Sequence, residues 1–139
     1  MIDKPKEKIN YKKRLWKLFS EYIRRRDGGR CYTCSTVKSW KEMNAGHYIP
    51  AGQSPPPLYF DERNVHCQCT SCNRFKHGNA TRYAEHLIQE YGADIFSQFS
   101  ALRANKVKWN SWTYQIKIDE YKKKLEDYGT YQKGKRRQD

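Results

Sequence analysis

The fold of this chain is decided by one stretch, Asn64-Val65-His66-Cys67-Gln68-Cys69-Thr70-Ser71-Cys72-Asn73-Arg74-Phe75-Lys76-His77-Gly78. Within it, Cys69 and Cys72 have the C-x-x-C spacing with which a tight turn presents two thiolates to one metal ion. Upstream, Cys31 and Cys34 repeat the same spacing. Four thiolates complete the tetrahedral coordination of Zn²⁺ and leave no position open. The sequence therefore predicts a structural zinc site, not a catalytic one.

Two disulfides or buried free thiols are the alternative interpretation of these four cysteines. The doubled C-x-x-C spacing favours zinc, because a cytosolic chain keeps its thiols reduced. The fifth cysteine, Cys67, has no partner at metal-ligand spacing, and we expect it to be a small apolar side chain in a strand.

Polar residues follow the second pair of cysteines directly. If the chain enters a helix at Cys72, then Asn73 and His77 lie four residues apart on the same helix face. Lys76 would lie on the neighbouring flank, and the free N–H groups of a helix N-terminus attract phosphate. This pattern predicts a place where a metal ion and a phosphate group are held together, although Asn73 could also serve only as a helix cap.

Between the two cysteine pairs lies the sequence Ala45-Gly46-His47-Tyr48-Ile49-Pro50. Together with the C-x-x-C pairs, Asn64 and the Cys-Asn-x-x-Lys ending at Lys76, it resembles the HNH endonucleases. More closely, the whole pattern resembles the phage NinG, or Rap, recombination endonucleases. The resemblance covers about residues 10 to 127 and implies an α+β fold, in which a small zinc-stabilised ββα-metal core in a treble-clef-like frame is flanked by an N-terminal basic helix and C-terminal helices.

The resemblance also assigns roles to individual residues. It implies that Asn64 pins a loop and orients His47, and that Asn73 is a ligand of one catalytic Mg²⁺ or Mn²⁺. Many HNH enzymes place an acidic metal ligand directly before the histidine, whereas this chain has Gly46. We therefore expect His77 to act as the second ligand, or else to contact phosphate directly.

Phosphodiester hydrolysis needs an activated water, a cation and positive groups near the phosphate. His47 can supply the first, since neutral imidazole has an ordinary pKa of about 6.5 and accepts a proton from water. Lys76 would contact phosphate. The alternative is that His47 is a hydrogen-bonded structural residue. We expect His66 and His86 to be structural or surface residues.

Charge points to a polyanionic partner. The 139 residues include 28 Lys and Arg against 15 Asp and Glu, a net charge of +13. Residues 1–30 alone contain 11 basic and 4 acidic side chains, a difference of +7. We expect DNA to be bound by the basic residues of this segment and by Lys76. The resemblance implies that this DNA is branched. The predicted DNA-binding residues are Lys12, Lys13, Arg14, Lys17, Arg24, Arg25, Arg26 and Lys76.

Helical periodicity outlines the rest of the chain. It predicts helices over about 11–26, 81–91, 95–102 and 111–128. The mean hydropathy of −1.12 predicts that the hydrophobic core is small. The apolar stripe over 114–128 fits either core packing or a short dimer seam. The predicted divisions are a basic helical segment (1–30), the zinc-framed HNH-like core (31–80), C-terminal helices (81–128) and a disordered basic tail (129–139). The role of the proline loop over 55–57 stays open.

Several function classes are compatible with these features. We expect a cytoplasmic phage or prophage protein that contacts no membrane and cuts Holliday junctions or related structures, and two symmetric cuts would suit a homodimer. A non-catalytic zinc protein that binds branched or single-stranded DNA is the main alternative, and 11 Tyr and 4 Trp would suit base stacking. A protein-interaction adaptor would leave His47, Asn73 and His77 unexplained.

Overall fold

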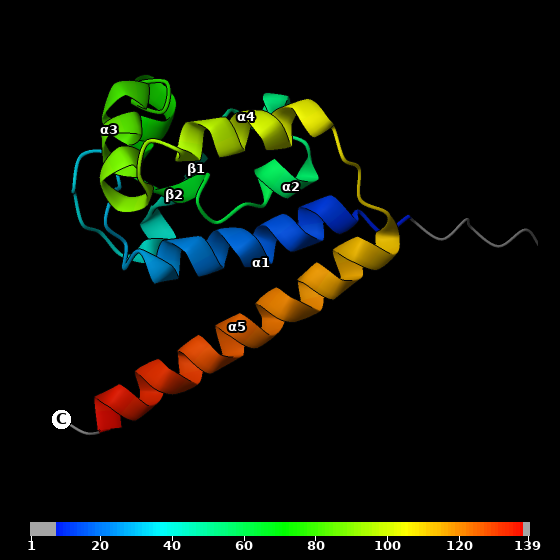
Figure 1. Cartoon of the computed structure of the whole chain (residues 1–139). Helices are drawn as coiled ribbons and strands as arrows, with labels where there is room; N and C mark the ends of the chain where they lie inside the picture. The colour runs from blue at the N-terminus through cyan, green and yellow to red at the C-terminus, as the bar shows by residue number, and fades with distance from the viewer. Residues whose placement is uncertain (1–7, 138–139) are drawn as a thin grey trace, which may run out of the picture.

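The computed structural model describes residues 8–137, with side chains as far as residue 128. Helix α1 runs through the middle of the molecule, with the sheet and α2 to α4 on one side and α5 on the other (Figure 1). The helices and strands are α1 (Tyr11–Arg26), β1 (Asn44–His47), α2 (Pro56–Tyr59), β2 (Val65–Gln68), α3 (Ala80–Tyr91), α4 (Ile95–Asn105) and α5 (Ser111–Arg137), with single turns η1 (Trp40–Glu42), η2 (Ala51–Gln53) and η3 (Ser71–Phe75).

Helix α1 forms where the sequence predicts it. Asn10 caps its first turn, since Asn10 Oδ1 accepts a hydrogen bond from the Lys13 backbone N–H at 3.0 Å. Leu15, Phe19 and Ile23 recur at helical spacing and are fully buried. They form the main core together with residues of β2 and α5. Helix α1 is therefore the element on which the two sides of the molecule pack.

The sheet has two antiparallel strands, which pair Gly46 with His66 and His47 with Val65. Alternate residues point to opposite faces. Val65 belongs to the core beneath α1, whereas His66 contacts the hydroxyl of Tyr83 from α3 at 3.1 Å. The same hydroxyl donates to the Gly46 carbonyl at 2.7 Å. The sheet thus has one face toward α1 and one toward α3, and the predicted α+β class is confirmed.

Helix α5 packs along α1. Ile118 and Tyr121 are buried in the main core, and Tyr114 packs against it. The Tyr128 hydroxyl donates to the Arg25 carbonyl at 2.9 Å. Of the two interpretations of this stripe, the structure supports core packing.

The last helix is longer than the sequence pattern indicates. We expected it to end near Tyr128 and a disordered tail to follow, but α5 continues to Arg137. The added residues are mostly Lys, Arg and Gln, which are good helix formers and can extend an anchored helix. The last two residues of the expected tail, 138–139, lie outside the described part of the chain.

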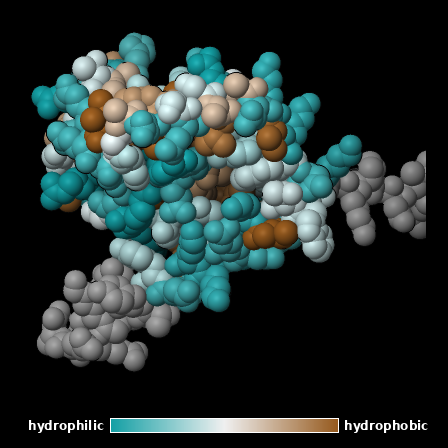
Figure 2. All heavy atoms as spheres, in the orientation of Figure 1, coloured by the Kyte–Doolittle hydropathy of each residue, from teal (hydrophilic) through white to brown (hydrophobic). Residues whose placement is uncertain are grey.

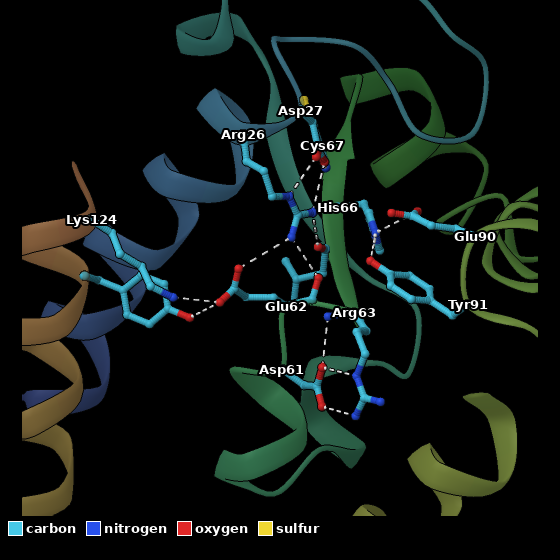
Figure 3. A network of polar contacts seen from close by, with 12 residues as sticks. Arg26, Asp27, Asp61, Glu62, Arg63, His66, Cys67, Glu90, Tyr91 and Lys124 are labelled. Carbon is cyan, nitrogen blue, oxygen red and sulfur yellow. Dashed lines mark hydrogen bonds and ion pairs between the residues drawn. The ribbon is translucent and has the colours of Figure 1, made fainter. Parts of the chain in front are cut away.

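A polar network joins α1, β2 and α5 (Figure 3). The Arg26 guanidinium donates to the Asp27 carboxylate at 2.8 Å and to the Val65 carbonyl at 3.0 Å. Asp27 in turn accepts from the Cys67 N–H at 2.8 Å. Glu62 accepts from Lys124 of α5 at 3.0 Å. Arg26, which the sequence assigned to DNA, therefore has its donors occupied within the protein.

The view in Figure 2 shows a face covered mostly by hydrophilic residues, with hydrophobic residues in small groups. This agrees with the low mean hydropathy of −1.12. No helix among residues 8–137 is both long and apolar enough to cross a bilayer.

We expect Asp27→Ala to lower the free energy of unfolding by about 2–4 kcal/mol, because it removes the acceptor of the Cys67 N–H and the carboxylate that pairs with the Arg26 guanidinium. Glu21→Ala is the control. Its carboxylate is about one-third exposed and pairs with Arg25 at 3.7 Å, so its removal should cost less than about 1 kcal/mol. Urea denaturation of the metal-loaded protein measures both, and equal losses would contradict a structural role for the network.

Candidate functional site

The four predicted zinc ligands come together. Sγ atoms of Cys31, Cys34, Cys69 and Cys72 all lie within 4.8 Å of one another, and the Cys34 and Cys69 sulfurs are 3.7 Å apart. A tetrahedral site with Zn–S distances of about 2.3 Å requires sulfur separations of about 3.8 Å. All five cysteines are free thiols, so the disulfide interpretation was wrong. The cluster could hold one structural metal ion.

The sheet holds the two halves of this cluster together. The Tyr32 N–H, between the first two cysteines, donates to the Cys67 carbonyl of β2 at 2.8 Å. In the second half, the Cys72 N–H donates to Cys69 Sγ at 3.4 Å. Cys67 itself is buried and outside the cluster, in keeping with its predicted role as a small strand residue.

The chain after Cys72 does not enter an α-helix, and this sequence prediction was wrong. Residues Ser71–Phe75 form one wide π turn, in which the Lys76 N–H donates to the Ser71 carbonyl at 3.0 Å. His77, Gly78 and Asn79 then all have positive φ, between 49° and 82°. Such backbone cannot continue a right-handed helix, so α3 begins only at Ala80.

This turn nevertheless brings the predicted residues together. His47 of β1, Asn73 of η3 and His77 line one pocket of about 320 Å³. Tyr83 of α3 lies on its wall. Lys76 points elsewhere, into a second pocket of about 350 Å³ that it shares with Cys34 and residues of α3. The structure therefore separates Lys76 from the histidines with which the sequence grouped it.

His47 is held by contacts that the sequence pattern did not reveal. Its Nε2 lies 2.9 Å from the Tyr59 carbonyl oxygen. Because a carbonyl only accepts, Nε2 carries the proton and the lone pair of the neutral ring is on Nδ1. The ring stacks on Trp16 of α1, with 5.1 Å between centroids and 18° between planes.

Burial controls the protonation state of His47. Desolvation lowers its pKa to about 4, and the nearby Lys12 ammonium also lowers it, although the hydrogen bond to Tyr59 acts in the opposite direction. His47 is therefore neutral near pH 7, the state in which an imidazole accepts a proton.

Asn64 acts on the loop and not on the imidazole. It is fully buried, and its amide accepts from the Ile49 N–H at 2.8 Å and donates to the Leu58 carbonyl at 3.2 Å. The loop between them contains α2, which has Pro55 as its N-cap and ends at Tyr59. Asn64 and the proline loop thus fix the position of the Tyr59 carbonyl, which binds His47. Asn64 therefore affects the orientation of His47 only through this loop, whereas the family resemblance implied that it orients His47.

Comparison with known proteins shows the family of this chain. The sequence profile of a family described as "NinG: Bacteriophage Lambda NinG protein" matches residues 2–130. The chain belongs to the NinG family. The protein ninG of Escherichia phage lambda is 35% identical over 107 residues, covering 76% of this chain and 51% of the relative. Those of Escherichia phage 933W and Salmonella phage P22 are also 35% identical over 107 residues and 76% of the chain, covering 52% and 51% of their own lengths.

This NinG family member spans about half the length of the curated relatives it matches. No solved structure matches it significantly.

Position 46 has no room for a side chain in this NinG family member. A Cβ at this position would lie 1.9 Å from Gln68 Oε1 and 2.9 Å from Asn73 Oδ1. Any side chain would collide with the Gln68 amide, so an acidic residue before His47 is incompatible with Gln68 as it lies. Sequence spacing gave no signal for Gln68, because it acts across the sheet.

The predicted DNA-binding residues of α1 divide into two groups. Lys13, Arg14 and Lys17 line a groove of about 910 Å³ along α1. Arg24 also lines it, but its guanidinium donates to the Ser20 and Trp40 carbonyls at 3.1 Å and 3.2 Å. The others make contacts within the protein: Lys12 Nζ lies 4.3 Å from the centroid of Tyr59, Arg25 stacks over Trp40 at 4.4 Å, and Arg26 belongs to the polar network.

The pKa of His47 is open to direct measurement. We expect an NMR titration to give a value near 4, and Lys12→Ala to raise it by removing a positive charge. The control Lys17→Ala should leave it unchanged, since Lys17 lies in the groove along α1. Because the unfolded chain binds the proton first, this histidine's contribution to stability is complete above about pH 6.5 and is lost as the pH falls toward 4. An ordinary pKa in the folded protein would contradict the buried environment.

Proposed function

We propose that this protein is a metal-dependent endonuclease that hydrolyses phosphodiester bonds in branched DNA recombination intermediates, such as Holliday junctions. One observation carries the proposal: His47 of β1 and the Asn73–His77 segment, which follows Cys72 of the four-cysteine cluster, line one pocket. The His47 imidazole can supply a general base, and the Asn73 amide and His77 imidazole can supply ligands for a divalent cation.

Each residue has a defined part in the proposed reaction. Neutral His47 accepts the proton of the attacking water at Nδ1, while the Tyr59 carbonyl stabilises the imidazolium through Nε2. Asn73 and His77 would hold the divalent cation, Mg²⁺ or Mn²⁺. When bound, this cation neutralises charge on the phosphate and the leaving oxygen.

The basic groove along α1 is the proposed path of the DNA backbone. Its residues Lys13, Arg14 and Lys17 could neutralise successive phosphates. Lys12 lies between this groove and His47, because its ammonium sits over Tyr59, which also contacts the His47 ring. The branched structure of the substrate is inferred from membership of the NinG family alone.

Structural Zn²⁺ is the metal that we propose for the four cysteines. Such a site supplies folding free energy to a small domain with a thin core. It would fix the η3 turn, which follows Cys69 directly and carries Asn73.

One observation favours the non-catalytic alternative, a zinc protein that only binds branched or single-stranded DNA. His47 is held by a carbonyl and an aromatic stack, contacts that also suit a structural residue. Cleavage distinguishes the two functions.

We expect the zinc-loaded protein to cut a labelled four-way junction only when Mg²⁺ or Mn²⁺ is present, and His47→Ala to reduce the rate by at least about 100-fold through loss of the base. His86→Ala is the matched control, since this histidine lines the pocket of Lys76 and should not affect the rate. Flap, single-stranded and linear duplex DNA give the substrate order.

Equal cutting by His47→Ala and the wild type would contradict the proposed base. Tight junction binding without cutting by either protein would favour the non-catalytic alternative, provided that both contain zinc and melt at similar temperatures.

We expect one zinc ion per chain by elemental analysis. Cys69→Ser should lose it and unfold the centre of the protein, because three remaining thiolates leave the tetrahedral site incomplete. Cys67→Ala should keep the zinc, since this sulfur is outside the cluster. Equal zinc content in the two variants would contradict the assigned ligand set.

A further inference from the structure

Gln68, the last residue of β2, has a side chain whose orientation is fixed. It is fully buried, and its Nε2 lies 2.9 Å from the Gly78 carbonyl oxygen and 3.1 Å from Thr33 Oγ1. A backbone carbonyl only accepts hydrogen bonds, so the NH₂ group must face Gly78. The amide oxygen of Gln68 is therefore on the opposite side.

That oxygen, Oε1, is buried and has no hydrogen-bond partner among the described residues. Buried polar atoms in folded proteins nearly always have a partner, so an unpartnered one points to a missing group. The amide is anchored at its nitrogen, and Oε1 therefore stays in this position without compensation from the chain.

A second amide oxygen lies beside it. Both Gln68 Oε1 and Asn73 Oδ1 face the position of a Gly46 Cβ, at 1.9 Å and 2.9 Å. Since these two distances sum to 4.8 Å, the two oxygens are no farther apart than that. Two neighbouring acceptors repel each other unless a positive group lies between them.

We propose that Gln68 is a ligand of the catalytic divalent cation, and that its Oε1 with Asn73 Oδ1 takes the place of the carboxylate that HNH enzymes carry before the histidine. The catalytic use of this cation rests on the proposed function. Neutral amide oxygens are suitable ligands for Mg²⁺ and Mn²⁺.

The same geometry explains Gly46. The Gln68 amide reaches across the sheet and occupies the volume where the acid at position 46 would lie. The oxygen comes from β2 instead of β1, and the glycine provides the space for it. Gly46 is then part of a rearranged metal site and does not mark a lost one.

Mn²⁺ binding tests this proposal independently of DNA cleavage. The full chain, loaded with zinc, is titrated with Mn²⁺ and free Mn²⁺ is followed by EPR. We expect Gln68→Leu to weaken binding by at least about tenfold, because it removes the amide oxygen. Thr33→Val is the control, since it removes a partner of Nε2 and keeps Oε1.

Other occupants of this space give different results. If a water, or the Asn73 NH₂ group turned toward Oε1, is the missing partner, then Gln68→Leu binds Mn²⁺ as the wild type does and the proposal is overturned. Equal losses in Gln68→Leu and Thr33→Val would also overturn it, because they would reflect the brace to Gly78 and Thr33 and not the oxygen.

A rescue provides the second test. Gly46→Asp combined with Gln68→Ala places a carboxylate before His47 and removes the side chain that collides with it. We expect this folded double variant to recover the Mn²⁺ affinity lost in Gln68→Ala alone, and no recovery would overturn the proposal.

The outcomes also separate this inference from the proposed function. Mn²⁺ affinity that depends on Gln68, in a protein that cuts no DNA, keeps the site and refutes the endonuclease. Metal-dependent cutting with Mn²⁺ affinity unchanged in Gln68→Leu refutes the ligand and keeps the endonuclease.

Discussion

Four cysteine sulfurs within 4.8 Å of one another join the segment after α1 to the segment after β2, and the candidate site depends on this junction. A small hydrophobic cluster surrounds this junction, separate from the main core. Its buried members are Met43 and four cysteines, Cys31, Cys67, Cys69 and Cys72. A bound ion would thus replace apolar burial as the source of stability at this end of the molecule. At the same edge of β2, the Arg26–Asp27 pair ties α1 to the strand backbone, since Asp27 accepts from the Cys67 N–H whose carbonyl binds Tyr32.

The η3 turn, which contains Cys72 of this cluster, also places Asn73 at the candidate site. A standard α-helix after Cys72 would have carried Asn73 and His77 on one face, but the π turn and three left-handed residues place them around a pocket. Backbone in these conformations is costly and is commonly found where function requires it. Across the pocket, His47 is fixed by the end of α2, which is itself held by Asn64.

Electrostatics separate two kinds of basic residue in this highly charged protein. Lys13, Arg14 and Lys17 of α1 remain available in a groove, whereas Arg24, Arg25 and Arg26 are used for internal contacts. Burial and the nearby Lys12 keep His47 neutral, so a chain with a net charge of +13 still presents an uncharged imidazole to its pocket. Gln68 and Asn73 extend this pattern, because both direct neutral amide oxygens toward the position of a Gly46 Cβ.

The sequence alone determined the four clustered cysteines and the α1 helix, because ligand spacing and helical periodicity are local properties. The family resemblance supplied the grouping of His47 with Asn73 and His77, and the structure decided that the 114–128 stripe packs in the core. Tertiary structure decided which atoms hold His47, where Lys76 points, that Arg26 is internal and that Gln68 lies over Gly46. The Tyr59 contact uses a backbone carbonyl, which every residue has, so no residue type could indicate it. Gln68 reaches Gly46 across the strand pair, and a contact of that kind depends on register and side-chain direction, which exist only once the two strands have paired.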